Sequence, residues 1–279
     1  MAINGHYKIF DKSRCLGKDG ATISASSGDS SSEFALDQNS ETVWRSSGSN
    51  DLTTETIEVS FEEQEIDRIF LLAHNLKDFD IMYDLVGVWT HFASVVGIGG
   101  SLSNITETTF AYDTAYYEFT PVTTTKIRIR ANKSQVVDAE KYIAQIIVTT
   151  ELGTLAGWPR VKGVDITRNP RSVKTLSGFY SIQKSLEVTS FDFEFKDYPA
   201  TTTYSVDIDL MMTLQDREEA FLVWLCGGKQ GTTFFKYTLR GWRLQDLFQM
   251  QVAKPIKLAY SDGIYSNQIN AKVEFESVI

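Results

Sequence analysis

The residue types best suited to bind a ligand lie in the stretch ALDQNSETVWRS, which runs from Ala35 to Ser46. Asp37, Asn39 and Thr42 offer side-chain oxygens here, and a hard cation such as Ca²⁺ takes six or more oxygen ligands, backbone carbonyls included. The same residue types form tight turns, because their short polar side chains bond nearby backbone groups. The spacing therefore leaves two interpretations open, a calcium site and an Asx turn.

A second candidate site is aromatic. Trp89, His91 and Phe92 follow one another closely in the sequence, and together they could form a platform for a sugar ring, whose apolar C–H face packs on an aromatic face. The alternative is core packing, since aromatic residues of small β-sandwiches are commonly buried. Trp44 is expected to be a core anchor.

The sequence offers little support for catalysis. Its three histidines have no cysteine or carboxylate at the spacing of metal ligands, and it contains no H-E-x-x-H, G-x-S-x-G or phosphate loop. His74 ends an apolar strand and is expected to be a hydrogen-bonded structural residue. The acidic string Asp78, Asp80 and Asp84 indicates a solvated face, because nothing places two of its members across a scissile bond. We therefore expect a protein that is not an enzyme.

Composition indicates a globular chain of 279 residues, 42% of them hydrophobic and 12% aromatic. No apolar run approaches the 18 residues of a membrane span, and the opening residues do not show the basic and apolar stretches of a secretion signal. Cys15 and Cys226 are expected to be ordinary thiols rather than a disulfide, because they are widely separated and fall in different predicted domains.

Charge is unevenly distributed along the chain. Residues 1–152 carry 12 Lys+Arg and 22 Asp+Glu, a net charge of −10, whereas residues 153–279 carry 15 and 14, a net charge of +1. The acidic half should repel a phosphate backbone, so nucleic acid is not an expected partner. Two glycines and a proline in Gly153–Pro159 mark a domain boundary. The prediction is a first domain over 1–152, a linker over 153–159 and a second domain over 160–279.

Short, β-branched and aromatic segments separated by turn residues predict that the first domain is a jelly-roll β-sandwich. Strict alternation is clearest in TKIRIRA, where Ile127 and Ile129 can face a core while Lys126, Arg128 and Arg130 face water. The whole chain is accordingly expected to be mainly β.

The second domain is predicted as a β-barrel or sandwich with one α-helix. Long alternating patterns on either side of Pro199, over 185–198 and 201–213, predict paired strands. A helix is predicted at about 214–227, with acids in its first turn and Gly227-Gly228 as its stop. Further along, Arg240, Trp242 and Arg243 are either interface anchors or a cross-strand cluster on an exposed sheet.

The string ALDQNSETVWRS, followed by IEVSF at Ile57–Phe61 and by IDRIFLLAHNL at Ile66–Leu76, resembles the discoidin family over roughly residues 20–152. This family, also called coagulation-factor type C domains, belongs to the galactose-binding-like jelly rolls. The resemblance implies a structural Ca²⁺ held by Asp37 and Thr42, with Glu140 or Glu151 completing the site.

The same resemblance implies that a glycan or a lipid head group binds at loops on one end of the sandwich. In this sequence those loops include Ser47–Thr53, Asp78–Tyr83 and Val88–Ser94.

Residues 160–279 are similar in architecture to tail-tube and distal-tail proteins of bacteriophages, which implies assembly into a homo-oligomeric ring. The leading hypothesis is therefore a structural virion protein of a phage tail or baseplate, made in the host cytoplasm. Its expected partners are other tail or baseplate proteins, copies of itself and a cell-surface glycan. The alternative is a carbohydrate-binding adhesion module with an appended β domain, and a third hypothesis is a glycan-processing enzyme.

Overall fold

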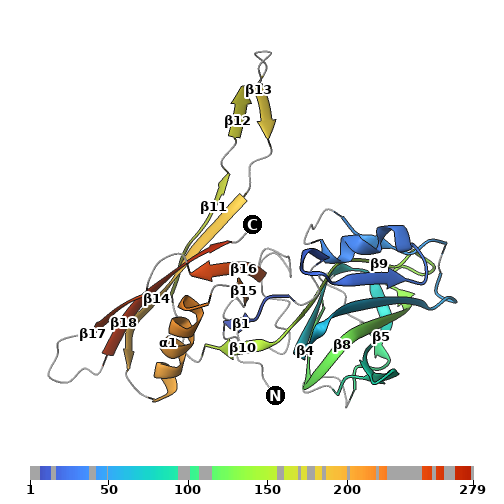
Figure 1. The fold of residues 1–279 in the computed structure, drawn as a ribbon, viewed down its shortest axis with the longest axis horizontal. Coiled ribbons are helices and arrows are strands. Elements are labelled where there is room, and N and C mark those ends of the chain that lie inside the picture. Colours follow the sequence, from blue (N-terminus) through green and yellow to red (C-terminus); the bar gives the residue numbers. More distant parts are fainter. Residues whose placement is uncertain are drawn as a thin grey trace. The chain divides into compact units, whose positions relative to one another are not determined.

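The computed structural model forms two compact units. Of the residues that the structure describes, the first contains those of Phe10–Glu151 and Leu247, and the second contains those of 7–9, 152–224 and 248–277. The structure describes residues 7–13, 17–37, 42–48, 50–93, 101–106, 115–155, 160–168, 171–174, 180–183, 187–199, 202–217, 220–224, 247–252, 256–260 and 268–277. The fold is mainly β, as the sequence predicts (Figure 1).

An eight-stranded antiparallel sheet builds the first unit, with two short 3₁₀ helices, η1 (Gly17–Asp19) and η2 (Asp29–Leu36). Its strands, in chain order, are β2 (Thr22–Ala25), β3 (Trp44–Arg45), β4 (Glu55–His74), β5 (Leu76–Leu85), β6 (Val88–His91), β7 (Ile105–Thr106), β8 (Ala115–Ser134) and β9 (Tyr142–Thr149). The main path is β3-β9-β4-β8-β5-β6, while β2 pairs with β4 and β7 with β5.

Two long strands fold this sheet into a sandwich. The first part of β4, up to Ser60, pairs with β2 and with the end of β8, whereas its part from Arg68 onward pairs with β9 and with the start of β8. Register shifts between Ser60 and Gln64 and between Ile66 and Arg68 separate the two parts. Such bulges bend a strand, so β4 and β8 each contribute to both layers.

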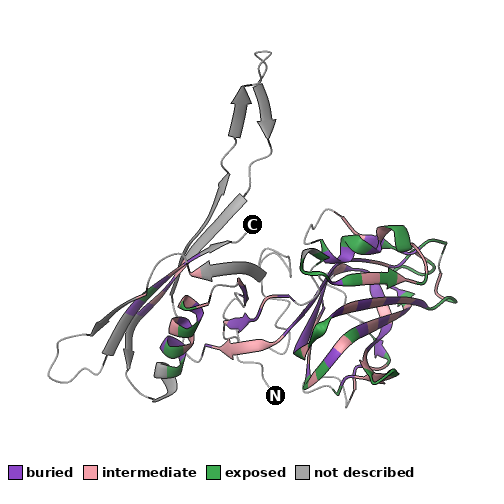
Figure 2. Ribbon diagram, in the orientation of Figure 1, coloured by how far each residue is buried: buried purple, intermediate pink, exposed green. Residues whose placement is uncertain are grey.

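The core lies between these layers and takes the alternate residues of each strand. Figure 2 shows buried and exposed residues alternating along the strands of the first unit. Ile127 and Ile129 are buried in the core as predicted, with Ile57 and Val59 from the first part of β4 and Ile69 from its second part. Trp44 is fully buried and donates its indole N–H to the carbonyl of Ser27 at 3.1 Å, which confirms it as a core anchor.

Gly28 makes the turn into η2 possible. Its φ of 63° lies in the left-handed region, and a Cβ added there would lie 1.9 Å from the carbonyl oxygen of Arg45. No side chain fits against the β3 backbone in this position, so glycine is required on both grounds.

The second unit has its own sheet and helix. The strands are β1 (Lys8–Phe10), β10 (Glu151–Thr154), β11 (Arg160–Arg168), β12 (Arg171–Lys174), β13 (Tyr180–Gln183), β14 (Glu187–Pro199), β15 (Phe221–Trp224), β16 (Leu247–Val252), β17 (Lys257–Tyr260) and β18 (Gln268–Ser277). The sheet order is β10-β1-β15-β16-β18-β14-β11 with β17 on β18, while β12 and β13 pair with each other. The unit core includes Phe193, Phe195, Met211, Val273 and Phe275.

The predicted helix at about 214–227 is wrong. The α-helix α1 covers Thr202–Gln215, where the alternating pattern predicts a strand, and Phe221–Trp224 forms strand β15. Ile208, Met211 and Leu214 are buried at helical spacing in α1. The apolar residues of this segment therefore fit the two-residue period of a strand as well as the 3.6-residue period of a helix, and packing against the rest of the unit selects the helix. All four residues of β15 are buried, which is typical of a central strand covered on both faces.

The predicted linker is strand at its start, because β10 extends to Thr154. Strand β1, from the beginning of the chain, also pairs in the sheet of the second unit.

Within the described parts of the chain, no helix is both long and apolar enough to cross a membrane.

Candidate ligand-binding face

The outer face of the sheet β2-β4-β8-β5-β6 gathers most of the charged and aromatic candidates of the first unit. Its inner face is the core, so residues of opposite parity point outward. The register pairs Glu58 with Arg128, Arg128 with Met82 and Met82 with His91 in one row across the strands. On one side, the neighbouring row holds Thr56, Arg130 and Asp80. On the other side, Ser60 pairs with Lys126 and Asp84 pairs with Trp89. We call this set the outer-face patch.

Trp89 is held in place by a cation. The guanidinium carbon of Arg128 lies 3.9 Å from the centroid of the Trp89 ring, a cation–π contact that stabilises the ring orientation. Arg128 is itself oriented by Glu58, whose Oε1 accepts from its Nε at 2.9 Å and also from its Nη2. The indole remains partly exposed, so a fixed aromatic ring lies beside charged groups on the surface.

Asp80 is the most buried charged group of the patch. Its side chain is only 7% exposed and its Oδ1 accepts the N–H of Asn104 at 2.6 Å. Nη1 of Arg130 lies 3.8 Å from its Oδ2, and Nε2 of His91 lies 3.9 Å from its Oδ1. Arg130 and His91 are 41% and 36% exposed, so two solvent-facing donors flank one inner carboxylate.

The structure does not bring Trp89, His91 and Phe92 together on one face as the predicted platform requires. Trp89 and His91 are half-buried on the outer face of β6, but Phe92 has no exposed surface and packs in the core, 4.0 Å from Phe119 between ring centroids. Alternation explains the difference, since Phe92 has the opposite parity to Trp89. Two of the predicted binding loops, Asp78–Tyr83 and the first part of Val88–Ser94, are likewise strands β5 and β6.

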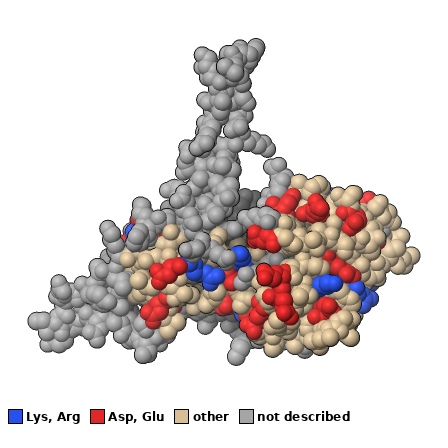
Figure 3. Space-filling view, in the orientation of Figure 1, with Lys and Arg blue, Asp and Glu red and all other residues tan. Residues whose placement is uncertain are grey.

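Acidic side chains predominate on the face of the molecule that Figure 3 shows. Figure 3 shows aspartate and glutamate side chains spread over the visible surface, with lysine and arginine gathered in a few places. The outer-face patch itself is balanced, because Lys126, Arg128 and Arg130 occur beside Glu58, Asp80 and Asp84.

The described residues predicted to bind calcium have partners within the chain. Thr42 donates its hydroxyl to Oδ2 of Asp37 at 2.7 Å, which favours the turn interpretation. The carboxylate of Glu140 faces Arg45 at 3.9 Å, and that of Glu151 is bound by Arg68. Among the described residues no three His, Cys, Asp or Glu side chains gather as a metal would require.

Several predicted residues lie outside the described part of the chain: Cys15, Asn39, Cys226, Arg240, Trp242 and Arg243.

A lysine serves as the cation of the loop that follows β3. Lys141 is fully buried, and its Nζ donates to the carbonyls of Asn50 at 2.7 Å and of Thr53 at 2.9 Å. Burial lowers the pKa of the ammonium, and the nearby carboxylates of Glu55 and Asp51 oppose that shift. No local pattern in the sequence points to this residue, because its partners are backbone oxygens about 90 positions away.

His74 is structural, as predicted. It is fully buried, its Nδ1 accepts the N–H of Leu76 at 3.1 Å, and burial lowers its pKa to about 3. The imidazole is therefore neutral at physiological pH.

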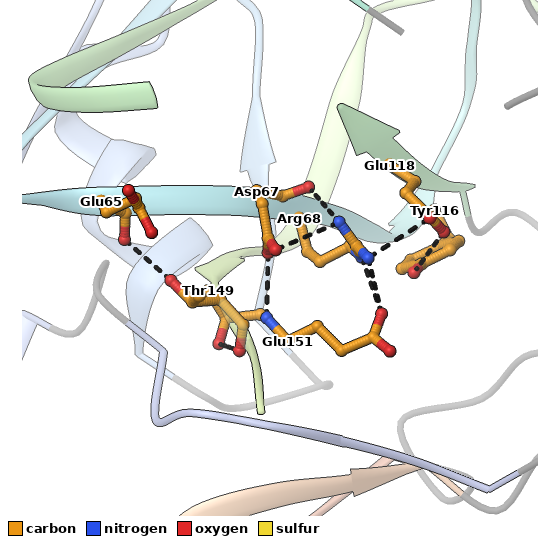
Figure 4. Close-up of polar contacts among 8 residues, drawn as sticks. Glu65, Asp67, Arg68, Tyr116, Glu118, Thr149 and Glu151 are labelled. Carbon is orange, nitrogen blue, oxygen red and sulfur yellow. Dashed lines mark hydrogen bonds and ion pairs between the residues drawn. The ribbon is translucent and has the colours of Figure 1, made fainter. Parts of the chain in front are cut away.

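Figure 4 shows a charge cluster around Arg68, on the opposite face of β4 from the core residue Ile69. Oε2 of Glu151 accepts from Arg68 Nη2 at 2.6 Å and Nε at 3.2 Å, while Oδ2 of Asp67 and Oε1 of Glu118 each lie 3.3 Å from the guanidinium. Tyr116 donates its hydroxyl to Glu118 at 3.2 Å. Burial raises the pKa of Asp67, although Arg68 opposes that shift.

This cluster joins three strands, since Arg68 and Asp67 belong to β4, Glu118 to β8 and Glu151 to the start of β10. The backbone N–H of Glu151 also donates to Oδ1 of Asp67 at 2.9 Å. Every charged member has a partner inside the cluster and at most 19% of its side chain exposed. The cluster therefore holds the start of β10 against β4 and β8. We assign it a structural role.

Comparison with known proteins gives structural matches only. No family model matches the chain, and no curated protein matches its sequence. Among solved structures, a chitosan-binding module of a chitosanase/glucanase from Paenibacillus sp. IK-5 is similar at 20% identity, over 49% of this chain and 97% of the module, with a TM-score of 0.36.

Two further similar structures are carbohydrate-binding modules from Clostridium perfringens. A family 32 module in complex with galactose shares 18% identity over 51% of this chain and 98% of its own, with a TM-score of 0.37. A module in complex with GalNAc-β-1,3-galactose shares 14% identity over 49% and 98%, also with a TM-score of 0.37. Each of these three modules is matched over almost its whole length and covers about half of this chain.

Proposed function

We propose that this chain is a non-catalytic, carbohydrate-binding protein in which the first unit binds a glycan through the outer-face patch and the second is an appended β domain. The observation that carries the proposal is the combination of a fixed, half-exposed Trp89 with the flanked carboxylate of Asp80 on one sheet face. Sugars present apolar C–H faces and many hydroxyls, so their sites pair aromatic rings with a few well-placed polar groups.

The polar groups of the patch are suited to this role. Carboxylates accept hydrogen bonds from sugar hydroxyls, whereas guanidinium groups only donate. Both kinds alternate across the strands β4, β8 and β5. Their orientation is set by regular strands rather than by mobile loops, which reduces the entropy lost on binding.

A glycan array probed with the full chain tests the proposal, followed by titration calorimetry on the best glycan. Replacing Trp89→Ala should weaken binding about tenfold, because aromatic packing contributes on the order of 1 kcal/mol or more beyond buried area. Phe34→Ala is the matched control, since Phe34 is an aromatic residue of η2 with 42% exposure and is not a member of the outer-face patch. An array without any bound glycan, or equal affinities for the two variants, would count against the proposal.

The phage-tail hypothesis rests on the architecture expected of residues 160–279 and receives no support from the comparisons. Its partners, its ring and its location in a virion remain predictions of the sequence. Electron microscopy of the purified full chain would show whether rings form.

A further inference from the structure

The two donors beside Asp80 lie farther from it than a direct hydrogen bond allows. Arg130 Nη1 and His91 Nε2 lie 3.8 and 3.9 Å from the two carboxylate oxygens. Hydrogen bonds from nitrogen to oxygen span about 2.7–3.2 Å, so neither contact is a direct hydrogen bond. An oxygen that hydrogen-bonds both groups from the side can bridge a contact of this length.

An oxygen placed at about 2.8 Å from both atoms of either pair fits this spacing. It must accept from the nitrogen and donate to the carboxylate, which a hydroxyl group does at once. The two pairs use different oxygens of the same carboxylate, Oδ2 toward Arg130 and Oδ1 toward His91. One sugar ring can supply both hydroxyls from adjacent carbons.

We infer that Asp80, Arg130 and His91 bind a vicinal diol of a neutral sugar. The inference rests on the proposed function and names the ligand class of that site. The residue that determines specificity is then an inner carboxylate on the sheet face. The loops at the end of the sandwich, where the resemblance places the ligand, are not needed for it.

The charge balance of the patch favours a neutral sugar over an acidic one. An anionic group brought to Arg130 and His91 would also meet Asp80, and its repulsion from that carboxylate offsets the attraction. Across the face, as many carboxylates as cations are present: Glu58, Asp80 and Asp84 against Lys126, Arg128 and Arg130. An acidic glycan therefore gains no net attraction here.

Trp89 extends the site along the strand. It lies two residues before His91 on β6, so its ring is on the same face and about 7 Å away along the strand. One sugar unit bound through its diol at Asp80 can thus continue toward a second unit at the indole.

The experiment uses the full chain and the neutral glycan that scores highest on the array. Asp80→Asn should weaken binding about 10- to 100-fold. The variant loses the charged acceptor, and its amide NH₂ is itself a donor that faces the donating hydroxyl of the sugar. Asp78→Asn is the matched control, since Asp78 is on the same strand but pairs with Lys133 at 3.2 Å. Arg130→Gln and His91→Ala should also weaken binding. Both replace side chains that are more than a third exposed, so they can be measured even if Asp80→Asn does not fold.

Periodate provides a second, chemical arm, because it cleaves vicinal diols and leaves isolated hydroxyls intact. Treating the immobilised glycan with periodate and then borohydride should abolish binding, and phenylboronate, which complexes diols, should compete. Unchanged affinity for the oxidised glycan, for Arg130→Gln and for His91→Ala would overturn the diol assignment while leaving glycan binding in place. Preference for uronate-bearing glycans would overturn it too. Failure to bind any glycan would instead overturn the proposed function itself.

Discussion

The ammonium group of Lys141 donates to the carbonyl of Asn50 across 91 positions of sequence, at 2.7 Å. A second bond, to Thr53, closes the loop around it. A structural metal ion often provides the positive charge on which backbone carbonyls of a loop converge. Here the ammonium group of Lys141 provides that charge. The loop thus carries its cation as part of the chain.

Lys141→Met should lower the free energy of unfolding by about 2–4 kcal/mol, because two loop carbonyls lose their donor and nearby carboxylates lose a counter-charge. Thermal melting and proteolysis within residues 50–53 would measure the loss. Lys126→Met, at an exposed lysine on β8, is the control and should stay within about 0.5 kcal/mol. A chelator should leave the wild-type melting temperature unchanged, and a clear decrease would show that a metal ion also holds the fold.

His74 should make stability depend on acid. Its folded-state pKa of about 3 lies below the usual 6.5. Stability is fully present above pH 6.5 and is lost as the pH falls toward 3, by up to about 1.4 kcal/mol per pH unit, because only the unfolded chain takes up the proton. Denaturant melts of wild type and His74→Gln between pH 7 and 4 provide the comparison, and parallel pH profiles for the two would refute the assignment.

Gly28→Ala should destabilise the first unit by about 2 kcal/mol or more. The new methyl would collide with the carbonyl of Arg45, and alanine disfavours the left-handed φ of 63°. Gly87→Ala is a control that separates the two causes, because Gly87 has a φ of 84° and no described atom lies within 4 Å of where its Cβ would be. Urea unfolding of both variants would test whether the first loses clearly more stability.

Arg68→Met should cost about 3–5 kcal/mol near neutral pH, since removing one partner leaves buried carboxylates uncompensated. The loss should shrink as the pH falls, because burial raises the pKa of Asp67 and its carboxylate then takes up a proton. Arg128→Met serves as the control, because Arg128 and its partner Glu58 are more exposed, at 25% and 34%. Equal losses for the two arginines in thermal melts would contradict the special role of the Arg68 cluster.

Alternation allows much of the sandwich to be predicted. Ile127 and Ile129 point inward and their charged neighbours outward because a strand has a period of two residues. The same rule, applied to β6, separates Phe92 from Trp89. Period alone fails at α1, where Ile208, Met211 and Leu214 suit a helix while nearby apolar residues also alternate, and only packing decides between the two.

The candidate site depends on register, which the sequence does not encode locally. Asp80, Arg130 and His91 belong to three strands, and their proximity follows from strand pairing, over 50 positions in the case of Asp80 and Arg130. Alternation can place each of them on a strand face, but it cannot bring them into neighbouring rows. A solvated carboxylate is therefore the natural prediction for Asp80, whereas the fold buries it beneath two donors.

The bent strands β4 and β8 have a consequence for how the first unit unfolds. Each is twenty residues long and pairs in both layers of the sandwich. A layer cannot peel away without breaking the hydrogen-bond ladder of a strand that also belongs to the other. The two sheets should therefore melt together in one cooperative transition, and amide protons of both layers should report the same free energy of opening in hydrogen exchange.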